Sequence, residues 1–223
     1  NMSKINTEKK SSEMIKDKII ETALADIAFD GWTDEVLLKA FKRCKIKTSN
    51  YPDLFPNGIL DCIVHFTNLA DKKMISEYES LDISPERVTE KIKSLILLRF
   101  KYLLPYKEAV RRSIAILALP GNGHLAVKSL YQTVDEIWRT AGDKSTDFSF
   151  YSKRGTLAAV YSSTMIAWIG NNNPDITFVE SFLDRRLDQV ALFGKISKPI
   201  KLTINSLLNQ FENIGFPDLN RNH

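Results

Sequence analysis

The sequence has little glycine and proline, with nine glycines and eight prolines among its 223 residues. That scarcity argues against a collagen-like chain, a low-complexity chain and a loop-rich β-sandwich. No apolar run reaches the roughly 18 residues that a membrane span needs. The N-terminal residues also lack the apolar core of a secretory signal. These absences predict a globular protein that is not integral to a membrane.

Cysteine and histidine are scarcer still, with two and three residues. Two cysteines, Cys44 and Cys62, provide neither a disulfide framework nor a zinc site, and their apolar surroundings predict buried thiols in a reducing cytoplasm. The three histidines show no metal-ligand spacing. We expect His65, which lies in an apolar helical pattern, to be a hydrogen-bonded structural residue, and we expect no metal and no cofactor.

Motifs of enzymes are absent from the chain. It has no nucleophile elbow, no P-loop, no dinucleotide-binding fingerprint and no zinc-protease helix. The pair Asp135 and Glu136 fits a solvated helix face better than a catalytic carboxylate pair. The sequence therefore predicts a protein that is not an enzyme.

What the chain does contain is helical periodicity along almost its whole length. Thr33 is a candidate N-cap for a short helix, and Ser84 with Pro85 is a candidate start for a later one. The segment 48–56 reads as a connection. The other predicted helices span about 12–30, 58–79, 84–104, 106–119, 124–140, 147–170, 175–194 and 199–215. We predict an all-α protein of nine to ten helices without a convincing strand.

These elements divide into parts by their character. Residues 1–11 read as a disordered tail with a tag remnant, and residues 12–80 as helix-turn-helix-like helices. Residues 81–196 read as a larger helical body for ligand binding and dimerisation. An amphipathic helix at 197–215 and a tail at 216–223 follow. This organisation resembles the architecture of TetR-type repressors.

The helix-turn-helix-like part raises the question of DNA binding. A local run of basic residues is suited to contact phosphates. The same cations also stabilise the C-terminal end of a helix through the helix dipole. The run comprises Lys39, Lys42, Arg43, Lys45 and Lys47. The turn is replaced by an irregular stretch, SNYPDLFPN, and the candidate recognition helix at 58–65 is apolar and carries Asp61. A helix that reads bases needs polar and basic side chains, so nucleic acid is an improbable ligand.

The most informative segment runs from Trp138 to Arg154 and reads WRTAGDKSTDFSFYSKR. It resembles the pattern W-x-x-A-G-D-x-S-x-D-F-x-[WF]-Y-[ST]-[KR]-R of the ubiquinone-biosynthesis accessory family, which comprises the ninth Coq protein of mitochondria and its bacterial relatives. Shorter matches occur in family order at 31–33, 54–58, 111–113 and 182–186. The resemblance covers about residues 12–194.

The resemblance implies a TetR-like fold that binds isoprenoid or phospholipid-like lipid instead of DNA. It implies a non-catalytic protein that takes a quinone-like intermediate from the membrane and presents it to the demethoxyubiquinone hydroxylase. We therefore expect a homodimer, formed through the helices at 147–170 and 174–194, in a bacterial cytoplasm and peripheral on the inner membrane.

The resemblance also places a hydroxylase-facing patch on this chain, and the residues themselves give it partial support. Phe148, Phe150 and Tyr151 lie within four positions at a helix start, so they cannot all face the core and at least one of them has to be exposed. An exposed aromatic beside charged residues has the composition of an interface hot spot. The alternative is that all three pack internally. For Lys153 and Arg154 the alternative is a structural ion pair with a carboxylate such as Asp143. The partner-patch candidates are Ile137, Asp147, Phe150, Tyr151 and Arg154.

The helix predicted at 147–170 is apolar on nearly every side, which is typical of a buried helix. With neighbouring helices it is suited to line a lipid cavity, although the same residue types also fill a solid core. The candidates for a lipid pocket are Leu95, Ile96, Ile114, Leu117, Leu157, Tyr161, Met165, Trp168, Phe182 and Leu183.

The last predicted helix carries a single apolar stripe, which suits docking either on the body of the protein or in a membrane interface. The membrane-helix candidates are Ile200, Ile204, Leu207, Leu208 and Phe211. The sequence thus favours a lipid-binding accessory protein. Two alternatives remain open: a TetR-type regulator with an apolar effector pocket, and a plain scaffold with a filled core.

Overall fold

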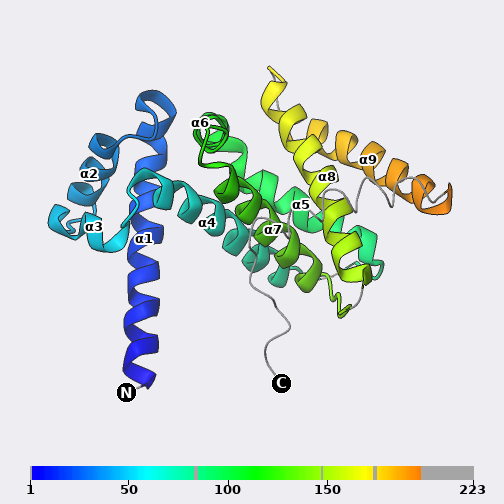
Figure 1. Ribbon diagram of the computed structural model, residues 1–223, viewed down its shortest axis with the longest axis horizontal. Helices are drawn as coiled ribbons and strands as arrows, with labels where there is room; N and C mark the ends of the chain where they lie inside the picture. The colour runs from blue at the N-terminus through cyan, green and yellow to red at the C-terminus, as the bar shows by residue number, and fades with distance from the viewer. Residues whose placement is uncertain (1, 83–84, 147, 173–174, 197–223) are drawn as a thin grey trace. The chain divides into compact units, whose positions relative to one another are not determined.

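The computed structural model describes residues 2–82, 85–146, 148–172 and 175–196, and every regular element in these ranges is helical (Figure 1). The α-helices are α1 (Met2–Asp30), α2 (Asp34–Arg43), α3 (Tyr51–Leu54), α4 (Ile59–Glu79), α5 (Val88–Leu103), α6 (Lys107–Leu117), α7 (Gly123–Thr140), α8 (Phe148–Gly170) and α9 (Ile176–Ile196). Single 3-10 turns at Thr48–Asn50 and Leu104–Tyr106 precede α3 and α6. The predicted all-α class is confirmed.

Local chemistry explains where α1 ends and α2 begins. Gly31 takes a φ of +81°, a left-handed conformation that glycine adopts without strain. The Thr33 hydroxyl then accepts a hydrogen bond from the Val36 backbone N–H at 3.3 Å, so Thr33 is the predicted N-cap. Asp34 and Glu35 in the first turn of α2 also stabilise the helix, because their negative charges lie at the positive end of the helix dipole.

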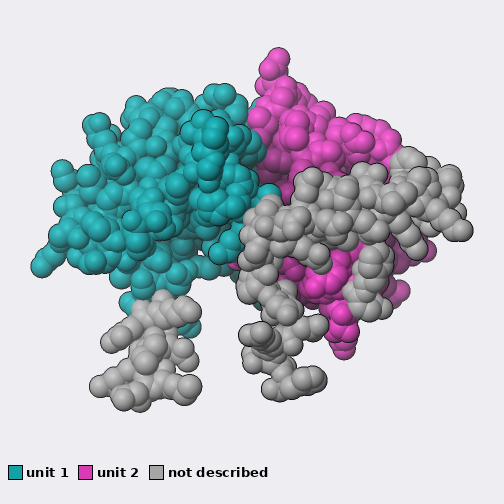
Figure 2. All heavy atoms as spheres, viewed as in Figure 1, with its two compact units in different colours: residues 1–80, 101–129 teal, residues 81–100, 130–223 magenta. Residues whose placement is uncertain are grey.

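The chain forms two compact units (Figure 2). Unit 1 comprises residues 1–80 and 101–129, and unit 2 comprises residues 81–100 and 130–223. The units divide the chain differently from the predicted parts 12–80 and 81–196, because residues 101–129, which include α6, group with the N-terminal helices.

In unit 1, α1 packs against α2, α4 and α6. The Trp32 indole N–H donates to the Ala109 carbonyl at 3.0 Å, which ties the turn after α1 to α6. Cys44 and Cys62 are buried free thiols, as predicted. Burial raises the pKa of the Cys62 thiol to about 12, so it remains protonated and unreactive at neutral pH.

In unit 2, α8 packs against α9, and the N-terminal part of α5 contributes to the same core. Trp168, Phe100 and Leu95 are fully buried there. The Phe100 ring meets the Trp168 ring edge-on, with centroids 5.4 Å apart and an interplanar angle of 88°. Such a contact stabilises a core beyond the area that it buries.

Some helix boundaries differ from expectation. α1 begins at Met2 and not near residue 12, because no glycine or proline interrupts the chain before Asp30. Pro85 was expected in the first turn of α5, but this helix begins at Val88. Ser84, its expected cap, lies outside the described residues.

Within the described residues, no helix is both long and apolar enough to cross a membrane. The amphipathic helix predicted at 197–215 and the tail at 216–223 lie outside the described residues.

Candidate functional site

The candidate recognition helix predicted at 58–65 is the start of α4, and the segment before it contains α3, a single turn at Tyr51–Leu54. The Tyr51 hydroxyl donates to Asp34 Oδ1 at 2.7 Å, and the Asn57 backbone N–H donates to Asp61 Oδ2 at 2.8 Å. The Tyr51 ring also packs against the Phe41 ring, with centroids 5.5 Å apart. These side chains hold the segment onto unit 1, and a single turn cannot present the row of base-reading side chains that a recognition helix needs.

The informative segment from Trp138 to Arg154 joins the end of α7 to the start of α8, with Arg154 at its centre. Only 3% of Arg154 is exposed. Its guanidinium donates from Nε to Asp135 Oδ1 at 2.7 Å and from Nη1 to Asp143 Oδ2 at 3.0 Å. Its Cζ atom also lies 3.4 Å from the centroid of the Phe150 ring. A buried arginine is stable only when paired in this way.

Asp143 collects donors from the loop and from α8. Its carboxylate accepts hydrogen bonds from Lys153 Nζ at 2.8 Å and from the Ser145 hydroxyl at 2.7 Å, besides the one from Arg154. Burial alone would raise the pKa of Asp143, but these hydrogen bonds outweigh it and hold the pKa well below its usual range. We call Asp135, Asp143, Lys153 and Arg154 the α7–α8 ion network.

Trp138 completes the junction. Its indole N–H donates to the Lys153 carbonyl at 3.1 Å, and Lys153 Nζ lies 5.5 Å from the ring centroid. Gly142, with a φ of +93°, ends α7 in a left-handed conformation. Most of the recognisable residues in this segment therefore have a structural task, which is to fix the start of α8 against the end of α7.

Only some residues of the predicted partner patch are exposed at the surface. Tyr151 is 45% exposed and Phe150 is half-buried, so at least one of the aromatic residues is exposed, as expected. Ile137 is fully buried, and Arg154, which pairs with Asp135 and Asp143, is nearly so. These two residues do not belong to an exposed patch. Asp147 lies outside the described residues.

An open groove of about 300 Å³ runs along unit 2 beside this junction. Its walls are mainly apolar side chains of α5, α7, α8 and α9, and its polar lining residues are three hydroxyl-bearing residues and one lysine. The lining residues are Thr89, Ile92, Trp138, Ser152, Lys153, Thr156, Leu157, Val160, Leu187 and Val190. An apolar hollow with a few polar groups is the usual form of a small-molecule site, and this volume is at the lower end of the range.

The predicted pocket residues do not form one lining. Leu95, Ile96, Tyr161, Met165, Trp168 and Leu183 are buried in unit 2, Phe182 is half-buried there, and Leu157 alone among the candidates lines the groove. Leu117 is buried in unit 1, and Ile114, in the same unit, is 40% exposed and is not a cavity-lining residue. The helical pattern identified most of these positions as buried, but it was wrong for Ile114 and could not separate packed positions from groove positions.

A buried polar group in unit 2 escaped the sequence analysis. Arg99 is buried within α5, donates from Nη1 to the Tyr161 hydroxyl, and has Nη2 3.5 Å from Thr133 Oγ1. The guanidinium carbon lies 5.4 Å from the centroid of the Tyr161 ring. The only available signal was an arginine at an otherwise apolar helical position.

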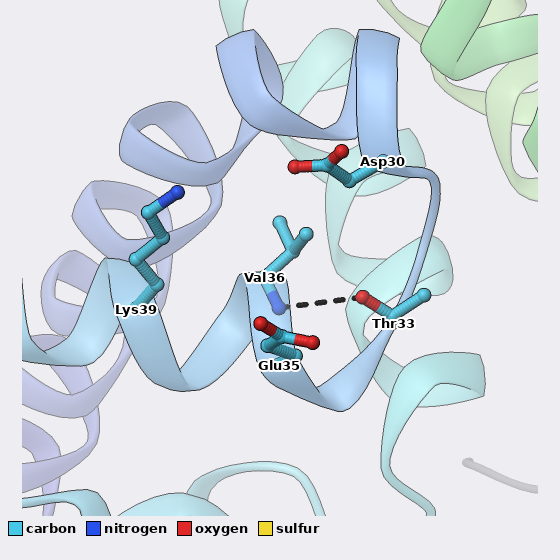
Figure 3. A pocket seen from close by; sticks show the side chains of 5 residues that line it. All are labelled: Asp30, Thr33, Glu35, Val36 and Lys39. Carbon is cyan, nitrogen blue, oxygen red and sulfur yellow. Dashed lines mark hydrogen bonds between the residues drawn. The ribbon is translucent and has the colours of Figure 1, made fainter.

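Unit 1 has a second hollow, of about 350 Å³, between the end of α1 and the first turns of α2 (Figure 3). It is lined by Asp30, Thr33, Glu35, Val36 and Lys39. The Thr33 hydroxyl is occupied by the helix cap, and Lys39 lies 3.8 Å from Asp26. This polar hollow lacks the apolar walls of the groove in unit 2.

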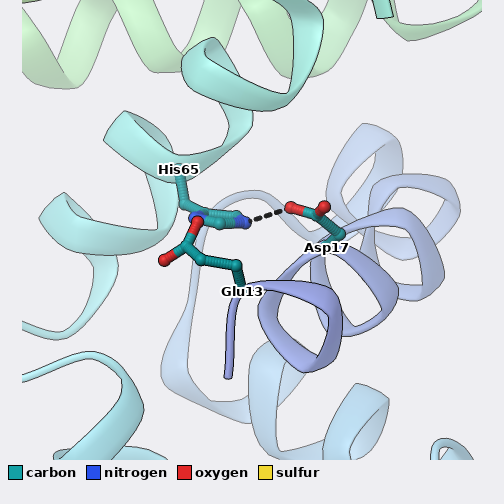
Figure 4. Close-up of side chains that lie close together, drawn as sticks. All are labelled: Glu13, Asp17 and His65. Carbon is teal, nitrogen blue, oxygen red and sulfur yellow. Dashed lines mark hydrogen bonds and ion pairs between the residues drawn. The ribbon is translucent and has the colours of Figure 1, made fainter. Parts of the chain in front are cut away.

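A titratable cluster joins α1 and α4 (Figure 4). His65 Nε2 lies 2.6 Å from Asp17 Oδ1, and its Nδ1 lies 4.0 Å from Glu13 Oε2. Burial lowers the pKa of His65 and outweighs the two carboxylates, which favour the charged ring. The three side chains are close enough for a metal ion, with candidate ligand atoms within 4.8 Å of one another. Lys72 Nζ, however, lies 3.2 Å from both carboxylates and supplies the positive charge there.

Comparison with known proteins agrees with the motif. The COQ9 family model matches residues 124–194, which contain the α7–α8 ion network and most of the groove. The mitochondrial ubiquinone biosynthesis protein COQ9 of Rattus norvegicus is 29% identical over 205 residues, covering 89% of this chain and 65% of the relative. The Homo sapiens protein is 28% identical over 205 residues, with 89% and 64% covered. The chain thus spans about 65% of the length of these curated relatives.

Among solved structures, the chain resembles the TetR transcriptional regulator from Nitrosomonas europaea. The TM-score is 0.65 at 21% sequence identity, and the match covers 80% of this chain and 99% of the regulator. Identity at this level shows the fold alone. In sequence, the chain is therefore similar to the COQ9 proteins, as the segment from Trp138 to Arg154 indicated, and its fold is TetR-like.

Proposed function

We propose that this chain is a non-catalytic, lipid-binding accessory protein of ubiquinone biosynthesis. It holds an isoprenoid or quinone-like lipid in the groove of unit 2 and presents that lipid to the demethoxyubiquinone hydroxylase at a membrane surface. The similarity to COQ9 proteins supports the pathway, and the chemistry of the groove supports the ligand.

The apolar groove is the observation that carries this proposal. Ile92, Leu157 and Val160 offer aliphatic walls for a prenyl chain, and the Trp138 ring offers a flat face. The hydroxyls of Thr89, Ser152 and Thr156 are the available hydrogen-bonding groups for a ring oxygen. A ligand with a long apolar part and few polar atoms matches this lining better than a charged metabolite does.

The position of Tyr151 supports a presenting role. This exposed aromatic residue directly precedes Ser152 and Lys153, which line the groove, on the first turns of α8. A partner that docks on Tyr151 therefore contacts the protein within about one helical turn of the bound lipid. The α7–α8 ion network ties the start of α8 to α7 and thereby favours a fixed separation between the two sites.

The remaining parts of the proposal concern assembly and location. The protein acts as a homodimer through α8 and α9, and Ile166 of α8, which is 70% exposed, is available for burial in such an interface. The apolar stripe from Ile200 to Phe211 docks on the membrane. Deletion of residues 198–223 is expected to abolish co-sedimentation with neutral phosphatidylcholine liposomes; unchanged sedimentation with these liposomes would contradict the membrane role of that stripe.

Fluorescence titration with a short-chain ubiquinone analogue tests the groove. Because Trp138 lines the groove, a quinone bound there is expected to quench its emission in a saturable way. Thr156→Phe places a ring in the groove and should weaken binding at least tenfold, since overpacking leaves no room for the ligand. Trp138→Phe should remove most of the quenching.

The matched control is Ser181→Phe, which adds the same ring at an exposed position of α9 outside the groove lining. This variant should bind like the wild type. Equal affinities of the Thr156→Phe and Ser181→Phe variants would place the quinone elsewhere and reject the groove as its site.

A further inference from the structure

Unit 1 carries a concentrated positive surface where α2 ends. We call it the lysine surface, and it consists of Lys18, Lys42, Lys45 and Lys47. All four residues are exposed, and none of them forms a side-chain hydrogen bond or ion pair within the part of the chain that the structure describes.

The packing of α2 on α1 brings the backbone at Lys18 close to the end of α2, where the other three lysines lie. Cys44 Sγ lies 3.7 Å from the Lys18 carbonyl oxygen and 3.3 Å from Thr22 Oγ1, so the end of α2 rests on the turn of α1 that begins at Lys18. The Lys45 N–H donates to the Lys42 carbonyl at 3.0 Å, and the φ of +58° at Lys45 then turns the chain toward Lys47.

Two other cations of α2 differ from the lysine surface because a carboxylate neutralises them. Arg43 and Lys39, also on α2, share the Asp26 carboxylate at 2.7 and 3.8 Å. From Val36 to Pro52 the chain has five lysine or arginine residues and no carboxylate. Lys42, Lys45 and Lys47 therefore have no carboxylate near them in the sequence, and exposed charges of this kind attract anions over roughly 10 Å at moderate ionic strength.

Helix stability does not account for this whole surface. A cation in the last turn of a helix is favoured by the helix dipole, which explains Lys42. The effect is confined to that turn, whereas Lys18 lies in the middle of α1 and Lys47 follows the end of α2.

We propose that the lysine surface binds the headgroups of an anionic phospholipid bilayer. Lysine is a compact, flexible point charge that suits a fluid layer of phosphates. Met14, one helical turn before Lys18 on α1, is 65% exposed and offers an apolar contact beside the charges. A duplex is the less suitable partner, because α3 is a single turn and lacks base-reading side chains.

This contact goes beyond the proposed function. It lies in unit 1, involves neither the groove nor the segment after residue 196, and gives the protein a second, electrostatic attachment to a membrane. This second attachment adds membrane binding that depends on anionic lipid and weakens as the salt concentration rises.

The test is co-sedimentation of the full chain with phosphatidylcholine vesicles, with and without phosphatidylglycerol. Each lysine near an anionic surface contributes about a fivefold gain in affinity. Lys18→Gln, Lys42→Gln and Lys47→Gln combined should therefore weaken binding to the anionic vesicles by about 100-fold. Lys45 is not substituted, because its backbone is left-handed and a different side chain there changes the backbone strain as well as the charge.

The matched control combines Lys101→Gln, Lys128→Gln and Lys144→Gln, which remove the same charge from exposed positions elsewhere. This control should keep most of the phosphatidylglycerol-dependent binding. Equal losses in both triple variants, or no loss in the first, would overturn the proposal. So would duplex DNA binding that depends on the lysine surface without any vesicle binding.

Binding to neutral vesicles separates this proposal from the proposed membrane helix. The lysine variant should bind neutral vesicles like the wild type, because an apolar anchor does not depend on these charges. If the lysine variant shows normal quinone quenching and binds anionic vesicles like the wild type, the proposal for the lysine surface is rejected, whereas the proposed lipid site in unit 2 is unaffected.

Discussion

Two clusters of charged and titratable side chains hold helices together in this protein, and they differ in their central residue. In unit 2, the α7–α8 ion network surrounds Arg154, whose charge is permanent and whose carboxylate partner Asp143 is almost completely buried. In unit 1, the cluster of α1 and α4 surrounds His65, with partners Glu13 and Asp17 that are partly exposed. The first cluster is insensitive to ordinary pH, whereas the second responds to it.

The difference follows from what each junction supports. The arginine network fixes the start of α8, where Tyr151 and the groove lie within one turn of each other. The histidine cluster fixes α1 on α4 and lies outside that groove. A permanent cation at the junction keeps the proposed lipid and partner sites in one arrangement at all pH values where the protein is folded.

The largest effect is expected from Arg154→Ala. This change leaves the Asp143 carboxylate buried with fewer donors, and breaking a buried pair in this way costs about 3–5 kcal/mol of the free energy of unfolding. Chemical denaturation measures it. Arg139→Ala is the control, because Arg139 also pairs with Asp135, at 2.7 Å, but is 59% exposed in its side chain. It should cost less than about 1 kcal/mol. Equal costs would show that burial does not distinguish the two arginines.

A smaller effect is expected from acidification. Burial depresses the pKa of His65 in the folded protein below its ordinary 6.5, so the unfolded chain takes up this proton more readily. The contribution of His65 to stability is therefore complete above pH 6.5 and decreases as the pH falls through and below that value. Denaturation at a series of pH values should show this decrease in the wild type.

His65→Gln should flatten that pH dependence near 6.5, while Arg154→Ala should leave it in place at a lower overall stability. A rise in wild-type stability on acidification would contradict this interpretation, because it would mean that the Glu13 and Asp17 carboxylates stabilise the protonated ring more than burial destabilises it.

The smallest effect on folding is expected from Tyr151→Ala. Tyr151 is nearly half exposed, so its loss should change the free energy of unfolding by less than about 1 kcal/mol while weakening binding to the hydroxylase. Phe150→Ala should cost more stability, because this ring lies against the Arg154 guanidinium. A larger loss of stability at Tyr151 than at Phe150 would place Tyr151 in the core and remove it from the partner surface.

Helix content and many helix ends could be predicted from the sequence because they depend on local chemistry. Thr33 caps α2 through a contact only three residues away, and Gly142 ends α7 through its own backbone conformation. The start of α5 was wrong by three residues because Pro85 permits a helix start without requiring one.

The site was harder to predict because it depends on contacts between helices. The motif around Trp138 was correctly identified as informative, and the ion pair of Arg154 with Asp143 was among the alternatives, but the burial of Ile137 and Arg154 was not predicted. Groove residues such as Val190 on α9 and Ile92 on α5 are ordinary apolar positions in their own helices. Only the packing of four helices makes them neighbours.

Native mass spectrometry of the purified protein, with extraction and identification of any bound lipid, tests the central claim most directly. We predict an isoprenoid or quinone-like lipid at a defined stoichiometry, which the Thr156→Phe variant loses and the Ser181→Phe variant keeps. A wild-type mass without lipid, unchanged after incubation with quinone analogues, would contradict the lipid-binding account and favour a protein whose groove has no ligand of this class.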